Sequence, residues 1–467
     1  MNRPTTPSDA STTLPYASPE LPHQLERGLG LPQAVALNIA NMVGIGPFIT
    51  IPLFISAMGG PQALVGWVIA AVLVLCDGLV WSELGAALPS SGGTYHFLRE
   101  AFGRYRWGRL MPFLFIWQFL VSGTLEQASG YIGVLAYVKY ALPNLDAGLG
   151  HWHVPGGLAT LGAVACAIVT VLLCRRIRIV GWLSIVLCIG TLVTVLIVIV
   201  AGLTHFDRQL FVFPKGAFAL DKKWFAGLGA AMAIAVYDFL GYYNICHLGD
   251  EVKNPGRTIP RAVILSVLLI GALYLTMSIS IMGVVPWREA MKSENIAATF
   301  MERLFGRGAA VTFTWFVVWT AVASLFAGTL GYSRIPYAAA RAGDFFPVFA
   351  RVHPRKHYPY VSLLAFGALT MVFCFFSLDL VINATVSIRI LIQFVGQIAA
   401  LHVVRVTRPD VVLPFRMWLY PLPSLVALVG WSFVWWTTPL TVMLAGLGVL
   451  AVGCAVFLAW QMLRARR

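Results

Sequence analysis

Apolar and polar positions along the chain separate into long apolar stretches divided by short polar segments. About twelve of the apolar runs have the roughly 20 residues that a helix needs to cross a bilayer. These runs begin near Leu31, Leu64, Pro112, Gly157, Val180, Phe225, Ala262, Val311, Tyr360, Val381, Leu422 and Pro439. The pattern therefore predicts an all-α polytopic membrane protein with about twelve transmembrane helices.

Two of these predicted helices are interrupted. The first contains Asn41-Met-Val-Gly-Ile-Gly-Pro-Phe48, in which Gly44 and Gly46 weaken the helix and Pro47 cannot donate a backbone hydrogen bond. A second break is expected at Tyr237-Asp-Phe-Leu-Gly241, about 190 residues later, and interrupted helices in corresponding halves indicate an internal repeat and a transporter's substrate site. Backbone that leaves a helix within lipid must find partners in protein, water or a ligand.

Composition agrees with a membrane protein. Hydrophobic residues make up 59% of the chain and charged residues 11%, whereas a soluble domain carries about 25% charged residues. The net charge of +14 comes from basic residues in the loops after predicted helices 2, 4, 8 and 10 and at the C-terminal end, so we expect no nucleic-acid partner. By the positive-inside rule, both termini face the cytoplasm of an integral protein of the cell (inner) membrane.

The chain lacks the sequence signatures of an enzyme or a metal site. Its seven cysteines have no metal or redox spacing and are expected to be small core residues. The nine histidines are scattered, and two of them in one loop do not make a closed zinc site. We therefore expect no catalytic residues, no bound metal and no organic cofactor.

Four sequence blocks resemble the amino acid–polyamine–organocation superfamily of secondary transporters. They occur in the order found in that family and follow predicted helices 2, 6, 8 and 10. The blocks are Ser82-Glu-Leu-Gly-Ala-Ala-Leu-Pro-Ser-Ser-Gly-Gly-Thr-Tyr95, Gly249-Asp-Glu-Val-Lys-Asn-Pro-Gly-Arg-Thr-Ile-Pro-Arg261, Tyr332-Ser-Arg-Ile-Pro-Tyr-Ala-Ala-Ala-Arg-Ala-Gly343, and Pro409-Asp with Pro414-Phe-Arg416.

The resemblance implies a 5+5 inverted repeat with discontinuous helices 1 and 6, plus two peripheral helices. It divides the chain into a first repeat at 27–205, a second repeat at 206–410, and helices 11–12 with a short tail at 411–467. Residues 1–26, which are rich in Ser, Thr and Pro at their start, are expected to form a disordered cytoplasmic tail and not a signal peptide.

Substrate-binding residues follow from the match to the broken helices. Gly44, Ile45 and Gly46 match the family's Gly-x-Gly, whose N–H groups point at a substrate carboxylate. The alternative for these glycines is a tight helix–helix contact. Tyr237 matches an aromatic gate over the substrate, and the carbonyls of Leu240 and Gly241 would accept bonds from its ammonium group. Asn41 lies on the same helical face, and we expect either ligand contact or a bond to the broken backbone.

Acidic residues inside the predicted membrane segments need partners or a function. Asp238 departs from the family, which usually has a small or neutral polar residue there. It is expected to be a counter-charge for a cationic group, a proton carrier or a structural hydrogen-bond acceptor. Glu126, beside Gln127, is a second candidate for substrate binding, and Asp77 is a third acid. Arg389 could neutralise one of them, and its pairing with Asp238 would weaken the case for a cationic substrate.

The coupling ion stays open at this level. Helix 5, Val180–Leu203, contains no Lys or Arg in the place where some family members use a lysine. Ser324 and Thr329 in helix 8 could contribute to a sodium site, although hydroxyls in membrane helices commonly bond to their own backbone. Proton symport, exchange and uncoupled flux also stay open. The loop Leu142–Val154 has no cysteine, so we expect no disulfide-linked subunit.

The sequence as a whole predicts a secondary active transporter of amino acids that works by alternating access. A polyamine, organic-amine or cationic amino acid transporter is the alternative within this class, because it would use the carboxyl groups of Asp238 and Glu126. A nutrient sensor that binds substrate at the same site without moving it is the alternative from a different class. The expected partners are an amino acid or amine and the lipid bilayer.

Overall fold

The computed structural model describes residues 28–90, 92–105, 107–151, 155–174, 180–354 and 358–465. The tail expected at 1–26 lies outside these residues. The helices in chain order are α1 (Leu31–Met42), α2 (Gly46–Met58), η1 (Pro61–Ala63), α3 (Leu64–Ala87), α4 (Thr94–Phe102), α5 (Leu110–Ala141), α6 (Leu145–His151), α7 (Leu158–Leu173), α8 (Val180–Thr204), α9 (Lys222–Phe239), η3 (Asn244–His247), η4 (Gly249–Glu251), α10 (Pro255–Met282), α11 (Trp287–Ala290), α12 (Ile296–Tyr332), α13 (Arg334–Arg341), η5 (Pro347–Ala350), α14 (Tyr360–Phe373), α15 (Leu378–Arg389), the π-helix η6 (Ile390–Val395), α16 (Gly396–Thr407), α17 (Leu422–Thr437) and α18 (Leu440–Ala465).

Each apolar run predicted from the sequence coincides with a helix. The largest difference in a starting point is at α12, which begins at Ile296 and not near Val311, because an amphipathic stretch kinked at Gly306 precedes the apolar run. By length and composition, five helical segments of the described chain could cross a membrane, or six when the bent pair α1 and α2 counts as one. The structure is thus that of a helical integral membrane protein, and the twelve-span organisation stays a prediction.

The predicted break in the first apolar helix is confirmed. Helix α1 ends at Met42 and α2 begins at Gly46, and the two axes differ by 53°. The Val43 N–H still bonds to the Ile39 carbonyl at 2.8 Å, and the Gly44 N–H bonds to the Met42 carbonyl at 3.2 Å. The chain then leaves the helical pattern, as expected where two glycines precede a proline.

The second predicted break is also confirmed. Helix α9 ends at Phe239, and Leu240 adopts an extended ψ of 133°. Gly241 has a φ of +109°, a conformation that side chains with a Cβ rarely adopt. The chain then resumes helical structure in the short 3-10 helix η3. Both interruptions therefore arise from local backbone chemistry that the sequence already contains.

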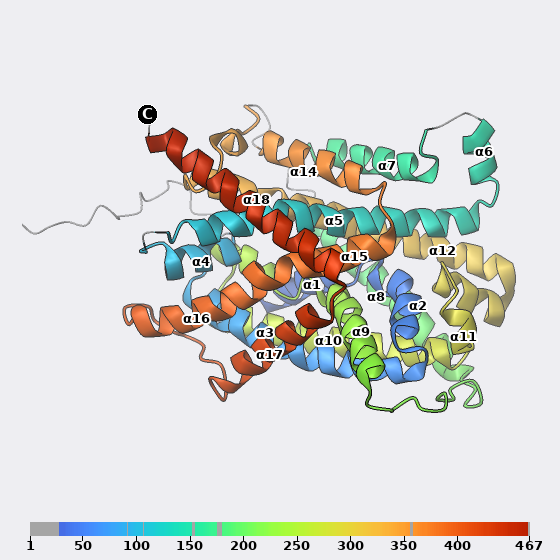
Figure 1. The fold of residues 1–467 in the computed structure, drawn as a ribbon. Helices are drawn as coiled ribbons and strands as arrows, with labels where there is room; N and C mark the ends of the chain where they lie inside the picture. Colours follow the sequence, from blue (N-terminus) through green and yellow to red (C-terminus); the bar gives the residue numbers. More distant parts are fainter. Residues whose placement is uncertain are drawn as a thin grey trace, which may run out of the picture.

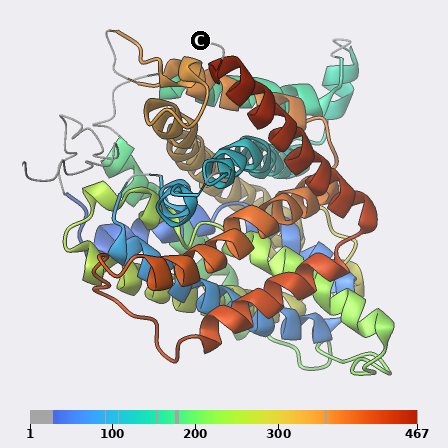
Figure 2. The same ribbon diagram turned by 60° about the vertical axis from the view of Figure 1, so that its left-hand side comes forward.

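The helices pack so that the two breaks come together near the middle of the bundle. Helix α2 packs against α9, α3 packs against α10, and α5 packs against both α12 and α15 (Figure 1). Helices α17 and α18, drawn in red, run across the near side of the bundle in Figure 1, and α18 follows its upper right side in Figure 2. The Arg405 guanidinium on α16 holds the buried Glu83 of α3 through two hydrogen bonds of 2.6 and 2.7 Å, which ties α3 to the segment after η6.

Candidate functional site

A small cavity lies where the two breaks face α5 and α12. Its volume is about 50 Å³, enough for a few water molecules at about 10–15 Å³ each. An amino acid therefore requires the cavity to widen. All the site residues predicted from the sequence except Gly241 line this cavity, namely Asn41, Gly44, Ile45, Gly46, Glu126, Gln127, Tyr237, Asp238 and Leu240.

The glycines of the first break allow close approach of two other helices. A Cβ on Gly44 would lie 2.7 Å from the Ser324 Oγ on α12, and a Cβ on Gly46 would lie 2.5 Å from the Asp238 Oδ1 on α9. In the described chain, the N–H groups of Ile45 and Gly46 have no hydrogen-bond acceptor. They stand at the N-terminal end of α2, where backbone N–H groups and the helix dipole favour an anion. Gly44 and Gly46 thus allow the helices to pack closely, and they leave the backbone N–H groups at the start of α2 uncovered by side chains.

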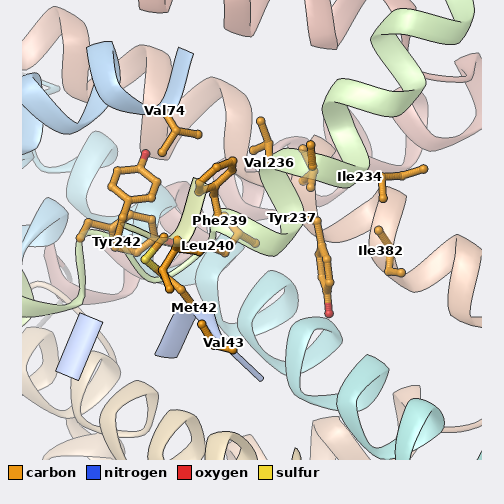
Figure 3. Packing of buried hydrophobic residues seen from close by; sticks show 14 of the residues in the cluster. Met42, Val43, Val74, Ile234, Val236, Tyr237, Phe239, Leu240, Tyr242 and Ile382 are labelled. Atoms are coloured by element: carbon orange, nitrogen blue, oxygen red, sulfur yellow. The ribbon is translucent and has the colours of Figure 1, made fainter. Parts of the chain in front are cut away.

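Tyr237 forms one wall of the cavity. Its ring extends from α9 toward α5 (Figure 3), and its hydroxyl is hydrogen-bonded to Ser129. Ser129 lies on the side of Glu126 that leads to the Ala141 end of α5. The Tyr237–Ser129 contact therefore lies on that side of Glu126. Ser129 was not identified from the sequence, because a serine in a membrane helix gives no signal of its own.

The sequence left two roles open for Asn41, ligand contact and a bond to the broken backbone. In the structure, Asn41 lines the cavity, and a second asparagine of α1, Asn38, bonds to the broken backbone. The Asn41 amide donates to the Tyr332 hydroxyl on α12 at 3.3 Å. Asn38, fully buried, donates from Nδ2 to the Tyr242 carbonyl at 2.7 Å and accepts from the Ile245 N–H at 2.9 Å. Asn38, and not Asn41, therefore satisfies the broken backbone after α9. The sequence does contain a signal for Asn38, because it is a polar residue in an apolar run, about one helical turn before Asn41.

Glu126 and Arg389 form a buried ion pair beside the cavity. The Arg389 Nη2 lies 2.6 Å from the Glu126 Oε2, and the Arg389 side chain is fully buried. The Tyr332 hydroxyl donates to the other oxygen of Glu126 at 2.9 Å. Arg389 also donates to the Ser122 Oγ at 3.1 Å and to the Tyr243 hydroxyl at 3.2 Å. This network joins α5, α12, α15 and the segment after α9, and it lies toward the Leu110 end of α5.

Asp238 has a different environment. Its Oδ2 accepts a hydrogen bond of 2.5 Å from the Thr50 hydroxyl on α2. Its Oδ1 is buried and has no hydrogen-bond partner in the described part of the chain. Arg389 pairs with Glu126, so the Arg389–Asp238 pairing considered from the sequence is not formed. Asp238 is thus a buried carboxyl in the cavity wall whose described contacts include no cation.

The other predicted residues have structural contacts as well. Gln127 accepts from the Thr329 hydroxyl at 3.1 Å, which engages the hydroxyl considered for a sodium site. Leu240 lines the cavity, while Gly241 lies beside Asn41 and outside the cavity wall. Asp77 lies apart from the cavity, where it accepts hydrogen bonds from Trp81, Trp431 and Tyr242. Within the described ranges, no three metal-ligating side chains come together.

The broken helices and the cavity between them are typical of one class of protein, a membrane permease. A sequence model of the family described as amino acid permease matches residues 29–462. The chain belongs to this family, within the amino acid–polyamine–organocation superfamily.

Several characterised relatives are similar over most of the chain. The cationic amino acid transporter 4 of Mus musculus is 29% identical over 76% of this chain and 56% of its own length. The cystine/glutamate transporter of Homo sapiens is 28% identical over 86% of this chain and 78% of its own length. The large neutral amino acids transporter small subunit 2 of Rattus norvegicus is 26% identical over 98% of this chain and 86% of its own length. This chain thus spans little more than half of the first relative.

Proposed function

We propose that this permease is a secondary transporter that moves amino acids by alternating access through the cavity between the helix breaks. The observation that carries the proposal is the pair of N–H groups of Ile45 and Gly46, which have no acceptor in the described chain and stand at the N-terminus of α2 beside the cavity. Such groups favour a carboxylate. The names of the relatives, which cover cationic, acidic and large neutral amino acids, support an amino acid as the substrate.

In this proposal the substrate carboxylate binds the N–H groups of Ile45 and Gly46, Gly44 allows its close approach, and the substrate ammonium group binds the carbonyls of Leu240 and Gly241. Tyr237 and its contact with Ser129 form the gate on one side of the substrate. The network of Glu126, Arg389 and Tyr332 closes the other side. A cavity of about 50 Å³ has to widen to hold an amino acid, and alternating access requires the two sides to open in turn.

The finer organisation belongs to the same proposal. The twelve apolar helices form two inverted repeats of five, at 27–205 and 206–410, followed by two peripheral helices. Both termini face the cytoplasm, and the protein resides in the cell membrane. Transport uses no organic cofactor and no disulfide-linked subunit. The support for this organisation is the spacing of the two breaks, the basic loops after even-numbered helices and the resemblance to the superfamily.

A second candidate function is transport of polyamines or other organic amines. The observation that favours it is Asp238, a carboxyl in the cavity wall with no cation among its described contacts. An amine would bind this carboxyl and would not need the backbone N–H groups of the first break. The sensor alternative requires binding at the same site without flux.

Counterflow into proteoliposomes distinguishes these functions. Vesicles loaded with unlabelled compound are diluted into labelled amino acids, putrescine or spermidine, with empty vesicles as the control. We expect saturable uptake of amino acids. Uptake of the amines alone would transfer the function to the second candidate, and binding without any uptake would indicate a sensor.

A further inference from the structure

Asp238 lies beside the place where the proposed substrate carboxylate binds. A Cβ built on Gly46 would lie 2.5 Å from the Asp238 Oδ1, so this oxygen stands directly beside the first residue of α2. The same helix end presents the N–H groups to which the proposed substrate carboxylate binds. Two carboxylates at one helix end repel each other, and their repulsion is strong where water is excluded. An anion bound there therefore depends on a positive charge at or near Asp238.

The cavity wall contains two carboxyl groups, and in the described chain only one of them is paired with a cation. Glu126 is paired with Arg389 at 2.6 Å. Asp238 receives a neutral hydroxyl from Thr50 and has a free, buried Oδ1 in the described chain. A site with one uncompensated carboxylate is costly in a cavity within a membrane. The charge that balances it has to enter with the substrate or as a proton.

No other ionisable side chain on the surrounding elements supplies that charge within the described residues. The elements that pack against α9 are α2, α3, α10, α15 and α17, and neither α2 nor α17 contains an ionisable residue. Glu83 is held by Arg405, Asp77 by Trp81, Trp431 and Tyr242, and Arg389 by Glu126. The remaining ionisable residues are Lys222, Lys223 and Tyr237 on α9, Cys76 on α3, Arg257, Arg261 and Tyr274 on α10, and Asp379 on α15.

Most of these remaining groups lie too far along their helices from Asp238 to supply it with a positive charge. Lys222 and Lys223 begin α9, while Asp238 is at its far end. Arg257 and Arg261 lie in the first two turns of α10, and Asp379 begins α15. The Tyr274 hydroxyl donates to the Met42 carbonyl at 2.8 Å, and the Tyr237 hydroxyl is bonded to Ser129. Asp238 is thus left to bind an external positive charge.

We propose that Asp238 is the proton-coupling residue of this transporter. It binds one proton whenever a substrate of zero net charge occupies the cavity, and a substrate with a net positive charge takes the place of that proton. The proton comes from water on the side to which the cavity is open, forms an O–H bond at the free oxygen of Asp238, and is released to water on the other side. This inference rests on the proposed transport of amino acids and adds its coupling ion.

The test measures protons and substrate together in proteoliposomes that contain the pH dye pyranine. L-leucine and L-glutamine serve as net-neutral probes, and L-arginine and L-lysine as net-cationic probes. Exchange without a pH gradient is measured first, and absence of exchange for every probe would contradict the proposed function itself. For each probe that is exchanged, we expect a proton-to-substrate ratio of one if it is net-neutral and of zero if it is net-cationic. A ratio of zero for a net-neutral probe, or of one for a net-cationic probe, overturns the proposal.

Asp238→Asn identifies the residue responsible. We expect the proton-to-substrate ratio of a net-neutral probe to fall from one to zero in this variant, and an inward proton gradient no longer to accelerate its uptake. Asp77→Asn is the matched control, since it removes another buried carboxyl that lies outside the cavity wall, and its ratio should stay at one. A ratio of one in Asp238→Asn overturns the assignment. The wild-type ratios test the charge balance even if a variant does not fold.

Discussion

Arg389 pairs with Glu126 at 2.6 Å, although the two residues are 263 positions apart in the chain. This pairing determines the electrostatics of the cavity, because it neutralises one of the two carboxyls in the wall and leaves Asp238 without a cation among its described contacts. It also places a buried charged network on the side of the cavity toward the Leu110 end of α5. The same interaction therefore contributes to closure and to the charge of the site.

Replacing Gly46 by valine should abolish transport. The new Cβ would lie 2.5 Å from the Asp238 Oδ1, and the side chain would block approach to the backbone N–H groups. We expect uptake to fall at least about tenfold, the result of losing about 1.4 kcal/mol of binding free energy. Gly448→Val is the matched control, because a Cβ on this helical glycine meets no atom within 4 Å. Normal uptake affinity in Gly46→Val would contradict binding of the carboxylate at this backbone.

Removing one partner of the buried ion pair should destabilise the protein more than removing both charges. Arg389→Met leaves Glu126, whose side chain is 12% exposed, without its cation, and the cost of about 3–5 kcal/mol for breaking a fully buried pair is the upper bound here. We expect the midpoint of thermal unfolding in detergent to fall in Arg389→Met and to recover in part in Arg389→Met with Glu126→Gln. Additive destabilisation in the double variant would show that the two side chains do not depend on each other.

The Tyr237–Ser129 contact should stabilise the closed cavity. Tyr237→Phe and Ser129→Ala each remove the same hydrogen bond, so each should weaken apparent substrate affinity by a similar amount, about 0.5–1.5 kcal/mol or roughly two- to tenfold. The double variant should be no weaker than either single variant. The measurement is the substrate concentration at half-maximal uptake. Independent, multiplying effects would contradict closure through this bond.

Asn38 should be more important for folding than Asn41. Asn38→Ala leaves the Tyr242 carbonyl and the Ile245 N–H without their bonds in a buried region, and each unsatisfied group costs about 1–3 kcal/mol. Asn41→Ala removes one bond of 3.3 Å to a tyrosine hydroxyl. We expect a clearly lower unfolding temperature for Asn38→Ala than for Asn41→Ala. Equal unfolding temperatures would contradict the structural role of Asn38.

The helix breaks could be predicted from the sequence because their causes are local. Gly44, Gly46 and Pro47 are sufficient to end a helix wherever they fall, and Gly241 occupies a φ of +109° that favours glycine. The apolar runs likewise determine where helices form. The start of α12 was misplaced because its first turns are amphipathic and lie outside the apolar run.

The partners of the polar residues could not be predicted because they come from distant helices. Thr50 meets Asp238 from α2, Ser129 meets Tyr237 from α5, and Tyr332 meets Glu126 from α12. These contacts depend on how helices pack, and a hydroxyl in a membrane helix usually bonds to its own backbone. Helix breaks, buried charges and the resemblance to the superfamily therefore identified the cavity-lining residues, while their hydrogen-bond partners required the three-dimensional structure.

Competition between amino acids and their decarboxylated amines tests the central claim most directly. In counterflow into proteoliposomes, L-leucine is compared with isoamylamine, and L-lysine with cadaverine, as inhibitors of labelled amino acid uptake. Recognition of the carboxylate by the backbone at Gly44–Gly46 predicts that each amino acid inhibits and that its amine is at least about tenfold weaker, a difference of about 1.4 kcal/mol. Equal or stronger inhibition by the amines would contradict this account and assign the site to Asp238.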